Sequence, residues 1–114
     1  MDKLKPAVLD KKNKKYKAVQ KISDIEKAQR RATEIYRKFG TLYLSTNKTK
    51  KFMIYDPIKK KMVHFGSYKP PMEDYLKHGD EKRRESFIRR MMGTKGDWKK
   101  NPFSPVNLSL FILW

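Results

Sequence analysis

Two histidines and several aspartates are the residues of this 114-residue chain whose types suit acid–base chemistry. The segment "KHGD" places His78 two residues before Asp80, and a histidine beside a carboxylate can act as a general base. A local explanation of this spacing is favoured, because Asp80 stands where the N-cap of a helix is expected. His64 lies in a run of strand-like alternation, where a packed ring is the commoner outcome. The remaining aspartates that such a base could use are Asp56, Asp74 and Asp97.

Other signatures of catalytic or cofactor sites are missing from the sequence. There is no cysteine, which excludes disulfides and thiol nucleophiles, and two histidines alone disfavour a structural zinc site. The sequence also has no glycine-rich phosphate loop and no G-x-S-x-G elbow. We therefore expect a protein that is not an enzyme and that holds no cofactor and no metal.

The positive charge of the chain is large and localised. The formal net charge is +17, from 29 basic and 12 acidic residues, whereas solubility asks for a magnitude of roughly 2 to 8 in a small domain. Residues 1–21 hold eight lysines and two aspartates, and residues 41–69 hold seven lysines and one aspartate, so each segment carries +6. Such an excess predicts an anionic polymer as the partner.

The basic residues of both segments are all lysines, which indicates contact with phosphates. Lysine provides a mobile point charge and lacks the planar fork with which arginine reads a guanine edge. We expect double-stranded DNA to be bound with low sequence specificity, with an A·T-rich preference arising only through DNA shape. The predicted central contacts are Lys48, Lys50, Lys51, Lys59, Lys60 and Lys61. The predicted outer contacts are Lys11, Lys12, Lys14 and Lys15 in the N-terminal segment, with Arg83, Arg84, Lys99 and Lys100 flanking.

Two other functions are compatible with the sequence. One is a single-strand or RNA-binding module that stacks bases on Tyr43, Phe52 and Tyr55, or on Trp98 and Trp114, although core burial is favoured for the tryptophans. The other is a structural or interaction protein whose basic surface meets an acidic protein partner.

The elements that position these residues begin with a flexible basic arm at 1–21, predicted from its lysine content and low hydrophobicity. Ser23 and Glu26 form a capping box before a helix expected over 24–38. Its apolar stripe consists of Ile25, Ala28, Ala32, Ile35, Tyr36 and Phe39, and Gly40 is predicted to end it in a left-handed conformation.

From Thr41 onward the apolar period changes to two. The segments "TLYLST", "KFMIYD" and "KMVHFG" each alternate, and turn residues separate them, including Asn47 and Pro57. This pattern predicts a three-stranded antiparallel meander.

The C-terminal part is predicted to be helical. "MEDYLKHG" suggests a short helix stopped by Gly79, and Asp80 then caps a helix whose Phe87, Ile88, Met91 and Met92 face one way. Ser104 and Pro105 begin a terminal helix whose apolar residues must be buried in the core or in a homo-oligomer seam. The expected fold is α+β: an N-terminal amphipathic helix, a three-stranded antiparallel meander and two to three C-terminal helices, all in one domain over 22–114.

The C-terminal two-thirds of the sequence resembles a small uncharacterised domain that recurs in nucleocytoplasmic large DNA viruses, including the marseillevirus, mimivirus and iridovirus groups. The resemblance is carried by "VHFG", "EDYLKHGDEKRR", "FIRRM", "GDWKK" and the closing "LW", while Gly79 stands where the pattern leads us to expect lysine. The first 40 residues are not covered. The resemblance implies a viral gene product but supplies no activity.

Together, charge and resemblance predict a protein that packages or organises a viral genome. The resemblance implies a location in the virion and in the viral factory or nucleus of the infected host cell. No run of about 20 apolar residues and no secretory signal is present, so neither a membrane partner nor secretion is expected.

Overall fold

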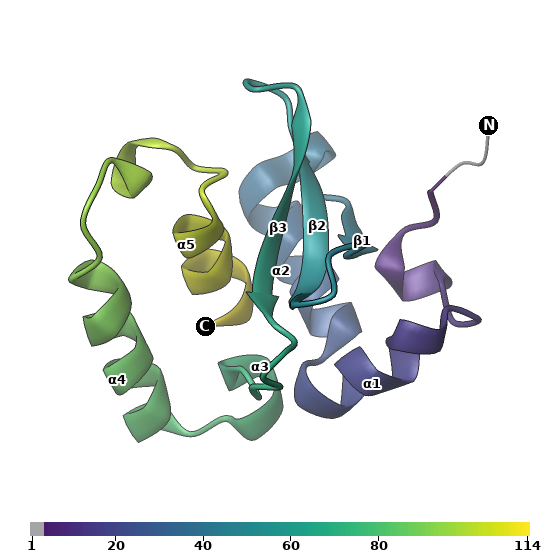
Figure 1. Cartoon of the computed structure of the whole chain (residues 1–114), viewed down its shortest axis with the longest axis horizontal. Coiled ribbons are helices and arrows are strands. Elements are labelled where there is room, and N and C mark those ends of the chain that lie inside the picture. Colours follow the sequence, from purple (N-terminus) through teal and green to yellow (C-terminus); the bar gives the residue numbers. More distant parts are fainter. Residues whose placement is uncertain (1–3) are drawn as a thin grey trace.

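The computed structural model describes residues 4–114 and shows an α+β fold (Figure 1). A three-stranded sheet is flanked by helices from both ends of the chain, with α2 behind the sheet and α5 beside β3. The helices and strands are α1 (Lys14–Ile22), α2 (Ile25–Tyr36), β1 (Leu42–Leu44), β2 (Lys50–Asp56), β3 (Lys61–Ser67), α3 (Tyr75–His78), α4 (Glu81–Met92) and α5 (Pro105–Leu108). Short 3₁₀ turns η1 (Ala7–Leu9), η2 (Arg37–Phe39) and η3 (Trp98–Lys100) connect them, and the π-helical η4 (Ser109–Leu113) extends α5.

The sheet is the predicted meander, with strand order β1-β2-β3 and antiparallel pairing throughout. Ile54 pairs with Leu42 on one side and Val63 on the other, while Phe52 pairs with Leu44 and Phe65. Because alternate residues share a face, this register gathers the apolar residues of all three strands on one surface. That surface is buried and consists of Leu42, Leu44, Phe52, Ile54, Val63 and Phe65.

Most of the apolar stripe predicted for the helix at 24–38 is buried in α2, but both ends of the helix differ from the prediction. Its N-cap is Asp24, whose side chain accepts from the backbone N–H of Lys27, whereas Ser23 is buried and ends α1. Ile35, within the last turn, and Phe39, beyond the helix end at Tyr36, are exposed and do not belong to the buried stripe. The buried stripe residues are Ile25, Ala28, Ala32 and Tyr36.

The N-terminal segment is not a separate arm over its described part, residues 4–21. Asn13 caps α1 by accepting from the N–H of Lys15, and both Ala7 and Val19 are fully buried in the core. Tyr16 packs partly against the same cluster one helical turn before Val19. These few apolar positions dock the segment although lysines dominate its composition. Residues 1–3 of the predicted arm lie outside the described residues.

The C-terminal elements follow the predicted capping signals. Gly79 ends α3 at φ 62°, and Ser104 caps α5 by accepting from the N–H of Asn107, with Pro105 in the first turn. The ring of Trp114 stacks on Phe87 with centroids 4.1 Å apart, which ties the chain end to α4. Met92 at the end of α4 is exposed, contrary to its predicted place on the apolar face.

The terminal apolar residues are buried against their own chain. Leu108, Ile112, Leu113 and Trp114 are at most 5% exposed, Leu110 is partly buried, and Phe111 is 50% exposed. The helix therefore needs no second copy to cover it, which removes the reason for predicting an oligomer seam there. None of the helices in residues 4–114 has the length and apolar character needed to cross a membrane.

Candidate nucleic-acid interface

A groove of about 730 Å³ separates the β2–β3 hairpin from the segment 97–105. Lys50 at the start of β2 and Lys59 beyond its end both line the groove, so it follows a seven-residue strand for about 20 Å. Four lysines of its lining come from two parts of the sequence: Lys50, Lys59, Lys61 and Lys100. The structure thus brings predicted central contacts and one predicted flanking contact to a single surface.

The hairpin tip is held in a fixed shape by Asp56. This residue is fully buried, and its Oδ1 accepts from the backbone N–H groups of Ile58 at 2.8 Å and Lys59 at 3.2 Å. Lys60 adopts a φ of 55°, which turns the chain back into β3. As predicted, the side chains of Lys59, Lys60 and Lys61 are exposed. The backbone under these lysines is thus ordered while their ammonium groups face solvent.

The opposite wall of the groove is anchored by Trp98. Its indole N–H donates to the carbonyl of Thr94 at 2.7 Å, and its own carbonyl accepts from Ser104 at 2.9 Å and from Asn107 at 2.8 Å. These bonds fix the loop to α5, so Trp98 anchors a surface loop and is not buried in the core as was expected. The partly exposed ring also lines the groove. Lys99 lies with Nζ 5.5 Å from the ring centroid, and both Lys99 and Lys100 are exposed.

His64 forms part of the floor. Its Nδ1 lies 2.6 Å from Ser45 Oγ, and Ser45 Oγ also accepts from the backbone N–H of Asn47. The ring is therefore tied to the β1–β2 loop and not to an aspartate. Neither His64 nor Asn47 was predicted to face the binding surface, although His64 is three residues from Lys61 and Asn47 three residues from Lys50.

Lys51 was predicted to contact DNA, but its position corrects that expectation. The residue is 1% exposed, and its Nζ lies 3.1 Å from Asp74 Oδ2 and donates to the carbonyl of Met72. Burial lowers the pKa of Lys51 and raises that of Asp74, and the two charges oppose these shifts in each other. Lys51 is thus a structural ion-pair partner that no phosphate can reach.

Lys15 also has a structural role, although it was predicted from its lysine-rich surroundings to contact DNA. Its Nζ donates to the carbonyls of Ser45 at 2.8 Å and Asn47 at 3.0 Å, which pins the β1–β2 loop to α1. Partial burial, and then the charge of Lys69, lower the pKa of Lys15. The other predicted lysines of this region are exposed and do not line the groove: Lys11, Lys12, Lys14 and Lys48.

The predicted flanking arginines do not line the groove, because both belong to α4. Arg84 Nε donates to the carbonyl of Trp114 at 2.7 Å, and its guanidinium lies 5.2 Å from the Tyr75 ring centroid. Arg83 is exposed and lies 3.8 Å from Glu73. Arg84 therefore secures the chain end, and Arg83 makes a surface ion pair of small energetic value.

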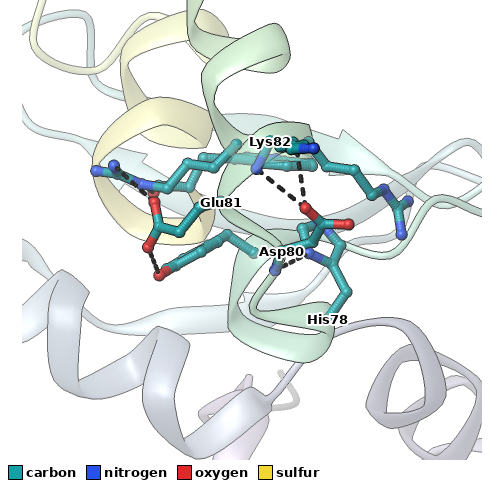
Figure 2. A network of polar contacts seen from close by, with 8 residues as sticks. His78, Asp80, Glu81 and Lys82 are labelled. Atoms are coloured by element: carbon teal, nitrogen blue, oxygen red, sulfur yellow. Dashed lines mark hydrogen bonds and ion pairs between the residues drawn. The ribbon is translucent and has the colours of Figure 1, made fainter.

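The start of α4 shows why "KHGD" is a structural motif (Figure 2). The Asp80 carboxylate accepts from the N–H groups of Lys82 and Arg83, while the Asp80 N–H donates to His78 Nδ1 at 2.9 Å. Beside it, the Tyr75 hydroxyl donates to Glu81. Asp80 is thus occupied as a helix cap, as the sequence indicated.

His78 is expected to make the fold sensitive to acid. Its Nδ1 must be unprotonated to accept from Asp80, and burial, followed by the charge of Arg83, lowers its pKa from 6.5. A group whose folded pKa lies below the unfolded value contributes stability above pH 6.5 that is lost as pH falls through the folded pKa. We expect a lower melting temperature at pH 5 than at pH 7. His78→Asn, which keeps an acceptor but does not titrate, should reduce this difference; an equal difference in both proteins would contradict the assignment.

Residues 40–91 match a protein family described as "Family of unknown function (DUF5754)". The matched stretch begins at Gly40, includes the whole sheet and ends one residue before the end of α4. It contains the hairpin wall of the groove but not the opposite wall at 97–105. No curated protein and no solved structure matches this chain.

Proposed function

We propose that the protein binds double-stranded DNA through its phosphates, with little sequence specificity, and packages or organises a viral genome. The observation that carries the proposal is the lysine-lined groove, where Lys50, Lys59, Lys61 and Lys100 converge on a chain of net charge +17. The viral setting, in the virion and in the viral factory or nucleus of the host, rests on the resemblance described above.

The dimensions of the hairpin suit a nucleic-acid backbone. One strand of B-DNA carries a phosphate about every 3.4 Å of helix axis, so a groove of about 20 Å that lies along the duplex covers about six base-pair steps. Lysines at both ends of such a path can follow the backbone without reading bases, because a mobile ammonium accepts any phosphate geometry. Any preference for A·T-rich DNA would then come from minor-groove width.

A second candidate is single-strand binding, which the position of Trp98 favours. Its part-exposed ring lies in the lysine-lined groove, where a base could stack. The previously expected stacking platform is less suited, since Phe52 is fully buried. Competition between duplex and single strands distinguishes the two candidates, because a stacking protein should prefer the single strand.

Neutralising the groove should weaken duplex binding and flatten its salt dependence. Lys59, Lys61 and Lys100 are exposed groove residues, and changing all three to alanine removes up to three phosphate contacts. Because each contact contributes about 0.9 to the slope of log affinity against log salt, the slope should fall by about 2 to 3. Fluorescence anisotropy of a labelled 20-base-pair duplex, titrated from low to high salt, measures both quantities.

The matched control removes the same charge elsewhere. Lys27, Lys77 and Lys82 are exposed and do not line the groove, so their replacement by alanine should change the slope less. Equal losses in the two triple variants would mean that net charge, and not the groove, attracts DNA. Failure of the unaltered protein to bind duplex at low salt would refute the proposed function itself.

A further inference from the structure

The tip of the β2–β3 hairpin carries an apolar side chain in a setting otherwise dominated by charge. Ile58 is 71% exposed, the largest fraction among the exposed large apolar residues of 4–114. It follows Pro57 and precedes Lys59, at turn positions where glycine, asparagine, aspartate and serine are the common residues. The turn between β2 and β3, to which Ile58 belongs, projects beyond the helices in Figure 1.

We propose that Ile58 is a wedge that enters the minor groove and partly unstacks one base step, so that the protein bends the DNA it binds. This inference rests on the proposed function. Proteins that kink DNA from the minor groove insert isoleucine, leucine, methionine, phenylalanine or proline between bases, and neighbouring basic residues hold the phosphates. The tip offers both Pro57 and Ile58, with Lys59, Lys60 and Lys61 directly after them.

The wedge is preorganised by the turn beneath it. The Ile58 N–H donates to Asp56 Oδ1 at 2.8 Å, and Asp56 itself is fully buried. Pro57 restricts its own φ, and Lys60 at φ 55° completes the reversal. A side chain on a fixed turn loses little conformational freedom on insertion, so more of the contact energy is available to separate the bases.

The position of Ile58 also directs the bend. Ile58 lines the lysine groove together with Lys59 and Lys61. DNA kinked at the tip would bring the adjoining backbone toward those lysines, which gives the bend a source of compensating contacts. This arrangement fits a protein that compacts a genome without reading its sequence.

The test compares Ile58→Ser with Leu9→Ser, a control at a similarly exposed position, 68%, on η1. One duplex carries 2-aminopurine at a central TA step, whose fluorescence rises on unstacking, and a second has fluorophores at its ends to report bending. A third duplex contains a central mismatch, which removes much of the unstacking cost. Melting temperatures of both variants should equal that of the unaltered protein, since both side chains are exposed.

The unaltered protein and Leu9→Ser should raise the 2-aminopurine signal, shorten the end-to-end distance and favour the mismatched duplex by roughly tenfold. Ile58→Ser should lose these three effects while keeping the salt slope of binding. Binding without unstacking or bending by the unaltered protein, or equal bending by Ile58→Ser, would overturn the wedge and leave the proposed function intact. Absence of duplex binding at low salt would overturn both.

Discussion

Replacing Lys51 by methionine is expected to lower the free energy of unfolding by about 3–5 kcal/mol, because it leaves a buried carboxylate without its counter-charge. Lys51 Nζ and Asp74 Oδ2 are 3.1 Å apart, with side-chain exposures of 2% and 0%. The loss of Nζ also removes the donor to the Met72 carbonyl. Urea unfolding at pH 7 measures the change.

The double variant Lys51→Met/Asp74→Leu separates the ion pair from simple packing. A buried pair replaced by apolar residues of similar volume is often neutral or stabilising, so the second substitution should restore most of the lost stability. Lys59→Met, at an exposed position, should alter stability by no more than about 0.5 kcal/mol. A double variant that is as unstable as Lys51→Met alone would show that the methionine, and not the unpaired Asp74, disturbs the core.

Lys51 illustrates where sequence reasoning about charge reaches its limit. Lys50 and Lys51 are adjacent and chemically identical, yet only Lys50 lines the groove while Lys51 is buried. The strand period gave no signal for this burial, because Lys51 lies on the face opposite Phe52 and Ile54, where Met53 is buried but Tyr55 is 42% exposed. Its partner Asp74 is 23 residues away, beyond the reach of any local pattern.

Local patterns predicted the fold well wherever periodicity or capping was strong. Strand alternation gave the meander, and the caps at Asp80 and Ser104 were placed correctly. The helix α1 was not predicted, because Val19 and Tyr16 are among its few apolar residues and lysines are many. Packing of these two residues against the core docks the helix in spite of its basic composition. The groove could be predicted only in part, since the wall carrying Lys100 meets the hairpin through tertiary packing alone.

Glycine is required at position 40, but not for the reason predicted from the sequence. The sequence suggested a left-handed helix stop, but Gly40 has a φ of −90°, and it is Arg37 that adopts a positive φ of 55°. What Gly40 provides is space. A Cβ at this position would lie 2.3 Å from the carbonyl oxygen of Ala32 and 2.7 Å from its carbonyl carbon. The chain leaving α2 thus passes directly against the helix backbone.

Gly40→Ala is therefore expected to destabilise the fold by about 3 kcal/mol or more, because both clashing groups belong to the backbone and cannot rotate away. Gly93→Ala is the matched control: Gly93 has a φ of −83°, and its nearest Cβ neighbour would be 3.5 Å away. Alanine there should be neutral or stabilise by up to about 1 kcal/mol through a less flexible unfolded chain. The urea midpoints of the two variants test this expectation. Similar midpoints would mean that the contact with Ala32 relaxes easily. A lower midpoint for Gly40→Ala alone shows that the close approach to the Ala32 backbone requires glycine at position 40.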